Sequence, residues 1–108
     1  MIEFEIVGEK EKVVVKLSGE LGLPSIAPIR KELQKLTKEH PRELTFDLSK
    51  TLSVDSNGIE LLISTKKSFV LFGGKVKISG ASDEIKGLFE VLGMTKDFIF
   101  EENPIKSN

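Results

Sequence analysis

The alternation of strand-like and helix-like patterns constrains the fold of this 108-residue chain more than any other feature. Apolar side chains recur at every second position in some segments and at every third or fourth position in others. The predicted strands cover about residues 2–7, 12–18, 43–48, 75–79 and 97–100, and the predicted helices about 26–39, 56–72 and 82–92. This order, ββαβαβαβ, predicts a single α/β domain with a mixed, mostly parallel sheet of four to five strands and about three main helices.

Glycine, proline and serine residues mark the predicted boundaries. Gly19 should end the second strand, and Pro41 should end the first helix because the residue before a proline avoids the helical region. The pair at 73–74, both glycines, should stop the second helix. Ser82 is suited to cap the third helix, whose main face should carry the apolar residues 85, 88, 89 and 92. For the second helix, the main face predicted from the spacing is Ile59, Leu62, Ile63, Lys66, Phe69 and Val70.

The composition excludes several classes of function. Charged residues make up 31% of the chain but nearly cancel to −1, so no overall positive field recruits nucleic acid directly. There is no cysteine and one histidine, which excludes disulfide partners and argues against a metal site or another bound cofactor. No apolar run approaches the roughly 20 residues that a membrane-inserted helix needs. We expect one cytoplasmic domain over residues 1–108, with a flexible tail at 101–108.

The segment SVDSNGIELL, residues 53–62, joins the third predicted strand to the second predicted helix. Loops that leave the carboxyl ends of parallel strands gather at one edge of the sheet, where binding sites usually lie. Asp55 is a suitable N-cap, and Gly58 permits close packing, so the residues alone predict no more than a helix start. A phosphate on Ser56 would meet the positive end of this helix and add about −1.5 to −2 charges. Its main effect should then fall on any protein docked at that edge.

The longer segment FDLSKTLSVDSNGIELL, residues 46–62, resembles the central motif of the STAS domain family, named for sulfate transporters and anti-sigma factor antagonists. KLSGEL at 16–21 is similar to the signature of that family's second strand. FGGKVKISGASDEIKGLFEVLGM at 72–94 resembles its later glycine pair, strand, helix and Leu-Gly-Leu ending. The resemblance extends over nearly the whole chain, with the pieces in the expected order and spacing.

The resemblance implies a bacterial anti-sigma factor antagonist with no catalysis of its own. Such a protein binds an anti-sigma factor with serine kinase activity, and thereby frees a sigma factor. Phosphorylation of Ser56 would release it, and a separate serine phosphatase would reset it. The site residues implied are Ser56 as phospho-acceptor, Asp55, Asn57 and Gly58 as shaping the phosphosite, and Gly22, Leu23, Pro24, Ser53 and Ile59 as contacting the partner.

Three positions depart from the family pattern. Asn57 stands where a second serine or threonine is usual, and Ser53 replaces an apolar or aromatic residue. Gly22 stands where many antagonists carry an aspartate, which affects any kinase, nucleotide or metal contact made there. Asp47, at the end of the predicted third strand, could orient Asp55 or bond to turn amides.

Two other functions remain to be weighed. A serine hydrolase would need a base beside its nucleophile, but the G-x-S-x-G motif is absent and His40 is predicted at the opposite edge of the sheet. The other is a non-switching STAS docking module in a stress-signalling scaffold or a lipid-transport complex, which would use the same fold as a binding surface.

Overall fold

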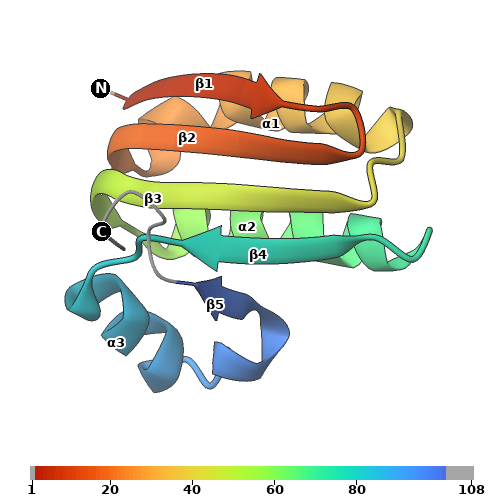
Figure 1. Ribbon diagram of the computed structural model, residues 1–108. Helices are drawn as coiled ribbons and strands as arrows, with labels where there is room; N and C mark the ends of the chain where they lie inside the picture. Colours follow the sequence, from red (N-terminus) through yellow and green to blue (C-terminus); the bar gives the residue numbers. More distant parts are fainter. Residues whose placement is uncertain (1, 102–108) are drawn as a thin grey trace, which may run out of the picture.

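The computed structural model describes residues 2–101, and within this range it contains one five-stranded sheet with helices packed against it (Figure 1). The elements are β1 (Ile2–Gly8), β2 (Lys12–Leu21), α1 (Leu23–Lys38), β3 (Glu43–Val54), α2 (Ser56–Val70), β4 (Lys75–Ser79), α3 (Asp83–Val91), a 3₁₀ turn (Thr95–Asp97) and β5 (Ile99–Glu101). β1 and β2 are antiparallel, and β2, β3, β4 and β5 are parallel to one another. The predicted fold class and element order are thus confirmed.

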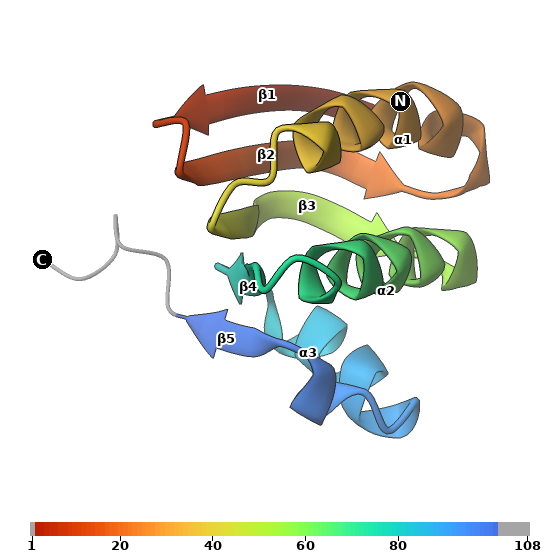
Figure 2. The same ribbon diagram turned by 90° about the vertical axis from the view of Figure 1, so that its right-hand side faces the viewer.

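The strands lie side by side in the order in which they occur in the sequence. Each of the three helices therefore connects two neighbouring parallel strands, and successive right-handed crossovers place α1 and α2 on the same face of the sheet (Figure 2). α3 packs on that face too, because its Phe89 meets the rings of Phe98 and Phe100 edge-on at 5.5 and 5.4 Å.

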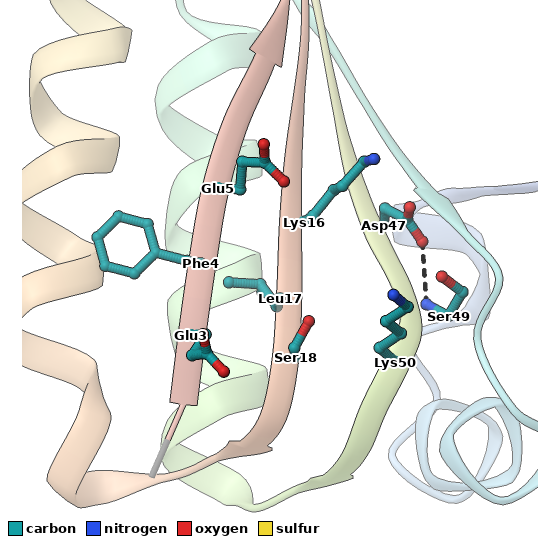
Figure 3. A pocket seen from close by; sticks show the side chains of 9 residues that line it. All are labelled: Glu3, Phe4, Glu5, Lys16, Leu17, Ser18, Asp47, Ser49 and Lys50. Atoms are coloured by element: carbon teal, nitrogen blue, oxygen red, sulfur yellow. Dashed lines mark hydrogen bonds between the residues drawn. The ribbon is translucent and has the colours of Figure 1, made fainter.

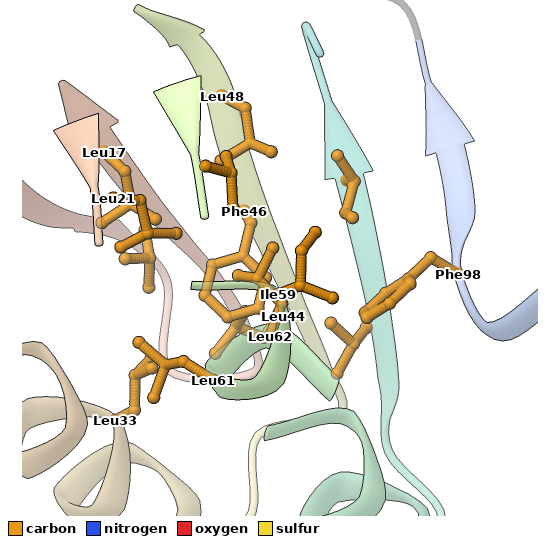
Figure 4. Close-up of a cluster of buried hydrophobic side chains, with 14 of the residues drawn as sticks. Leu17, Leu21, Leu33, Leu44, Phe46, Leu48, Ile59, Leu61, Leu62 and Phe98 are labelled. Carbon is orange, nitrogen blue, oxygen red and sulfur yellow. The ribbon is translucent and has the colours of Figure 1, made fainter. Parts of the chain in front are cut away.

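The core lies between this face and the helices (Figure 4). Leu44, Phe46 and Leu48 of β3 alternate inward and are 0–1% exposed. They pack in the same cluster as Leu61 and Leu62 of α2. Because β3 is the central strand, the helix that follows it is held against the middle of the sheet.

The predicted face of α2 was wrong in part. Val70 is 58% exposed, whereas Leu61 and Thr65, which were not assigned to that face, are buried. Thr65 can be buried because its hydroxyl donates to the Leu61 carbonyl at 2.8 Å. α2 packs against both the sheet and α1. Its buried face is therefore shifted toward α1 from the face that was predicted from the spacing.

Two strands are longer than predicted. β2 continues past Gly19 to Leu21, and β3 continues to Val54, so Gly19 does not end its strand. The parallel pairing continues through two register shifts, and Gly19 adopts a φ of 107° beside them. The third strand was predicted to end at about residue 48, whereas Ser53 belongs to the end of β3.

Other boundaries differ by a few residues. α1 begins at Leu23 instead of near residue 26, so residues 23–25 form its first turn, with Pro24 in a position that needs no N–H partner. α2 ends at Val70, before the predicted end, and Leu92 is 45% exposed rather than part of the buried face of α3. β5 begins after the 3₁₀ turn and includes Glu101, which had been assigned to the tail; the rest of that predicted tail lies outside the described residues.

The opposite face of the sheet carries polar side chains, and none of the helices described covers it. A depression of about 580 Å³ lies on this face. Figure 3 shows its lining side chains, with Lys16 between Glu5 and Asp47 on the neighbouring strands. Charged groups facing water do not need a helix layer above them. In the described part of the chain, no helix is long and apolar enough to cross a membrane.

Candidate functional site

The first turns of α1 and α2 meet at one end of the molecule, and Asp55 joins them. Its Oδ1 accepts the Gly58 N–H at 3.0 Å, and its Oδ2 accepts the Leu23 N–H at 3.2 Å. The pKa of Asp55 is lowered from 3.8, mainly by the bond from Gly58; desolvation is the next largest effect and opposes it, while Leu23 and Asn57 lower the pKa further. One carboxylate therefore caps α2, as predicted from the sequence, and also binds the start of α1.

Two glycines allow this close approach. A Cβ on Gly22 would lie 2.7 Å from Asp55 Oδ2, so the Asp55 carboxylate occupies the space that a side chain at position 22 would take. A Cβ on Gly58 would lie 2.5 Å from the Leu21 carbonyl oxygen. Glycine at position 22, where the family pattern has aspartate, therefore leaves the space that the Asp55 carboxylate occupies.

Ser56 is exposed in the first turn of α2, beside a groove of about 340 Å³. The groove is mostly apolar and is lined by Ser56, Ile59, Glu60, Ile63, Leu92 and Met94. Its walls come from α2 and from the turn that follows α3. A serine hydroxyl at this position is accessible to another protein, and it borders an apolar surface that a partner could cover.

A second groove of about 410 Å³ lies between α1 and the ends of β2 and β3. Its lining includes four of the residues singled out in the sequence: Gly22, Pro24, Ser53 and Asp55. Ser56 and Ile59 line the first groove, so six of the nine predicted site residues line one groove or the other, and Asn57 and Gly58 line neither. Leu23 lines neither groove, but it is 66% exposed at the start of α1. Ile59 is 3% exposed, so most of its side chain belongs to the core.

Four residues of the first groove were not predicted from the sequence to belong to the site: Glu60, Ile63, Leu92 and Met94. Ile63 had been assigned only to the face of α2. Leu92 and Met94 come from a turn that is distant from Ser56 in the sequence. They lie near Ser56 because of the path that the chain takes after α3, which the sequence pattern does not reveal. The one sequence feature at these two positions is the Leu-Gly-Met ending at residues 92–94, which indicates the end of a helix and not a place in the site.

Asp47 and His40 lie away from Ser56. Asp47 Oδ1 accepts the Ser49 N–H at 3.0 Å (Figure 3). Asp47 thus binds a nearby backbone amide, but within β3 and not in a turn after the end of the strand. His40 stacks on Phe72, with ring centroids 4.4 Å apart, beyond the carboxyl end of α2. The chain's one histidine is therefore not placed to serve as a base for Ser56. No group of three or more potential metal ligands occurs within residues 2–101.

Comparison of the sequence with known protein families identifies the family of this chain. The family model for the STAS domain matches residues 3–108. The chain belongs to the STAS family. Among curated relatives, an anti-sigma-B factor antagonist of Staphylococcus aureus is 29% identical over 80 residues, which is 74% of each chain.

Solved structures of STAS proteins share the fold. An anti-sigma factor antagonist from Mycobacterium paratuberculosis superimposes with a TM-score of 0.86, at 18% identity, over 97% of this chain and 89% of that one. The Bacillus cell fate determinant SpoIIAA in its phosphorylated form gives a TM-score of 0.75, at 18% identity, over 92% of this chain and 91% of that one.

Proposed function

We propose that this protein is an anti-sigma factor antagonist, and that phosphorylation of Ser56 switches its binding. In the unphosphorylated state it binds an anti-sigma factor that is also a serine kinase, and so frees a sigma factor in the cytoplasm. Phosphorylation releases the antagonist, and a serine phosphatase restores it. The protein acts as a binding switch in transcription regulation and carries out no catalysis itself.

The observation that supports this proposal most is the position of Ser56 beside the apolar groove. Ile63, Leu92 and Met94 offer a surface that a partner can cover with apolar side chains, and the serine hydroxyl lies at its border. A neutral hydroxyl is compatible with such a contact. A phosphate at the same atom is not, because its charge would have to lose water when the partner docks.

The charges near Ser56 strengthen the effect of a phosphate. Among residues 2–101, no lysine or arginine lines either groove, whereas Asp55 lines one and Glu60 the other. A phosphate on Ser56 would therefore add to existing negative charge without a basic side chain in either lining to neutralise it. The start of α2 offsets only part of this, at about 0.3–1 kcal/mol per charge near an exposed helix end. An unmatched charge at an interface costs several kcal/mol, so we expect binding to weaken by about 100-fold or more.

The test uses the full chain and the anti-sigma factor kinase of its native host. With ATP present, the kinase should phosphorylate the parent and a Ser49→Ala variant but not Ser56→Ala. Ser49 is a suitable control because it is exposed on the bare face of the sheet, outside both grooves. In calorimetric titrations, Ser56→Asp should bind at least about 100-fold more weakly than Ser49→Asp. Phosphorylation of Ser56→Ala at the parent's rate would contradict the assignment, and unchanged binding by Ser56→Asp would point to a docking module that does not switch.

A further inference from the structure

Two connections lie against each other at the end of the molecule opposite Ser56. The Lys75 N–H donates to the Arg42 carbonyl at 2.9 Å, and the His40 ring stacks on Phe72. The connection from α1 to β3 and the connection from α2 to β4 therefore form one continuous surface. Figure 2 looks on to this end, with both connections facing the viewer.

Two large apolar side chains are exposed at this end. Leu71 is 88% exposed and its neighbour Val70 is 58% exposed, at the point where α2 ends. Burial of α2 on the sheet does not require them, because Phe69 fills the core there at 0% exposure. A single exposed leucine is common on protein surfaces. Two adjacent exposed apolar side chains indicate a binding surface more strongly when the charges around them have one sign.

The charge around this pair is positive. Arg42, Lys67 and Lys75 are exposed, and no ion pair joins them to a carboxylate within residues 2–101. Lys67 lies in the last turn of α2, where it also suits the helix dipole, but Arg42 and Lys75 lie outside the helices.

The acidic groups at this end do not cancel that charge. Glu43 is bound to Lys77 at 3.1 Å, which leaves Glu39 as the exposed carboxylate of the α1–β3 connection. In the neighbouring turn between β1 and β2, at residues 9–12, two glutamates and two lysines balance each other.

We propose that this surface, the basic end formed by His40, Arg42, Lys67, Val70, Leu71 and Lys75, is a docking site for an acidic protein segment that carries an apolar side chain. The cations would meet carboxylates of the partner, and Leu71 would be covered by the partner's apolar side chain. Two apolar side chains are too small a face to enter a lipid bilayer. A second copy bound here through its grooves, which carry Asp55 and Glu60, would form open-ended chains of subunits, since the two surfaces differ.

The basic end acts independently of Ser56. The two are separated by the length of α2, whose 15 residues span about 22 Å. A partner at the basic end would therefore leave the grooves at the other end accessible, and the protein could hold two proteins at once. This docking site does not depend on the proposed phosphorylation of Ser56.

The test is an NMR titration of the full chain with a synthetic peptide of glutamates and aspartates around a central Leu-Phe pair. We expect shifts of the amides of His40, Arg42 and residues 70–75, and none at Ser56. Leu71→Ser should weaken binding about tenfold, the effect of losing one well-buried leucine contact. The double variant Arg42→Glu, Lys75→Glu should weaken it at least as much, and added salt should no longer weaken the binding that remains.

Matched controls exist for both variants. Val91 is 84% exposed on α3, and Lys31 is exposed on α1, so Val91→Ser and Lys31→Glu should bind the peptide as the parent does. Ser56→Asp should also bind it unchanged, whether or not Ser56 proves to be phosphorylated.

The proposal is overturned if Leu71→Ser and Val91→Ser lose peptide affinity equally, or if the amide shifts on peptide binding are centred on Ser56. It is also overturned if the chain prefers phosphatidylglycerol vesicles to the peptide. Self-association of the free chain in sedimentation that Leu71→Ser abolishes would assign the surface to a second copy instead.

Discussion

Replacing Gly58 by alanine should destabilise the protein at the junction that carries Ser56. The new Cβ would lie 2.5 Å from the Leu21 carbonyl oxygen, 2.8 Å from Val54 Cγ1 and 2.9 Å from Leu21 Cγ. The first of these atoms belongs to the backbone, and it already accepts the Asp55 N–H at 3.1 Å. Relief of the clash therefore requires α2 to move away from β2 or that hydrogen bond to lengthen.

The expected size follows from two opposing effects. Overpacking a close contact costs about 1–3 kcal/mol. Alanine is favoured over glycine inside a helix by up to about 1 kcal/mol, and by less near its start. The free energy of unfolding should therefore fall by about 1–2 kcal/mol, and the Tm by about 5–10 °C for a domain of this size.

Urea denaturation followed by circular dichroism would measure this change, with Gly87→Ala as the matched control. Gly87 is also helical, in α3, but a Cβ there would meet nothing within 4 Å. Gly87→Ala should therefore raise the free energy of unfolding by about 0.5–1 kcal/mol. If Gly58→Ala were as stable as Gly87→Ala, the close approach of α2 to the end of β2 would not exist in solution, and the geometry assigned to Ser56 would be wrong.

Three further perturbations test the interactions around the sheet. Gly22→Asp should displace the Asp55 carboxylate and return its pKa toward 3.8, which an NMR titration of the carboxyl carbons would detect; an unchanged Asp55 pKa would contradict the contact. Because the folded-state pKa of Asp55 is lowered, its contribution to stability is present above pH 3.8 and is lost as the pH falls through the folded-state value. Asp55→Asn should thus be less stable than the parent at pH 7, and the difference should shrink in urea titrations at pH 3. Lys77 binds Glu43 at 3.1 Å and Glu101 at 3.3 Å, and its pKa is raised mainly by Glu43. Lys77→Met should therefore speed amide hydrogen exchange in β5. Equal exchange rates in the variant and the parent would show that these ion pairs do not hold the strand.

The sequence was sufficient for the fold class because each element carries its own periodicity. The alternation in β1 and the three-and-four spacing in α1 are local, and the ββαβαβαβ order then limits the topology. Boundaries were less predictable where pairing extends an element beyond its local pattern. β3 reaches Val54 because its neighbour β2 continues to Leu21, and no local signal shows that.

The candidate site was predictable in part for the same reason. The cap at Asp55 follows from residue type and position, and the structure contains the bond from Gly58. The second bond of the same carboxylate, to Leu23, joins residues 32 apart in sequence and could not be read from spacing. Leu92 and Met94 were missed because they reach Ser56 only through the path of α3 across the sheet.

The sequential order of the strands has a consequence for synthesis of the protein. Each new strand pairs with the strand made just before it, so no segment has to wait for a distant partner. As the chain leaves the ribosome, β2 can pair with β1, and β3 and then β4 can be added as each helix docks. The junction of Asp55 and Ser56 needs α1, β2, β3 and α2, whereas the groove beside Ser56 also needs Leu92 and Met94, which follow α3. A chain that ends after β4 should therefore form the junction but lack that wall of the groove.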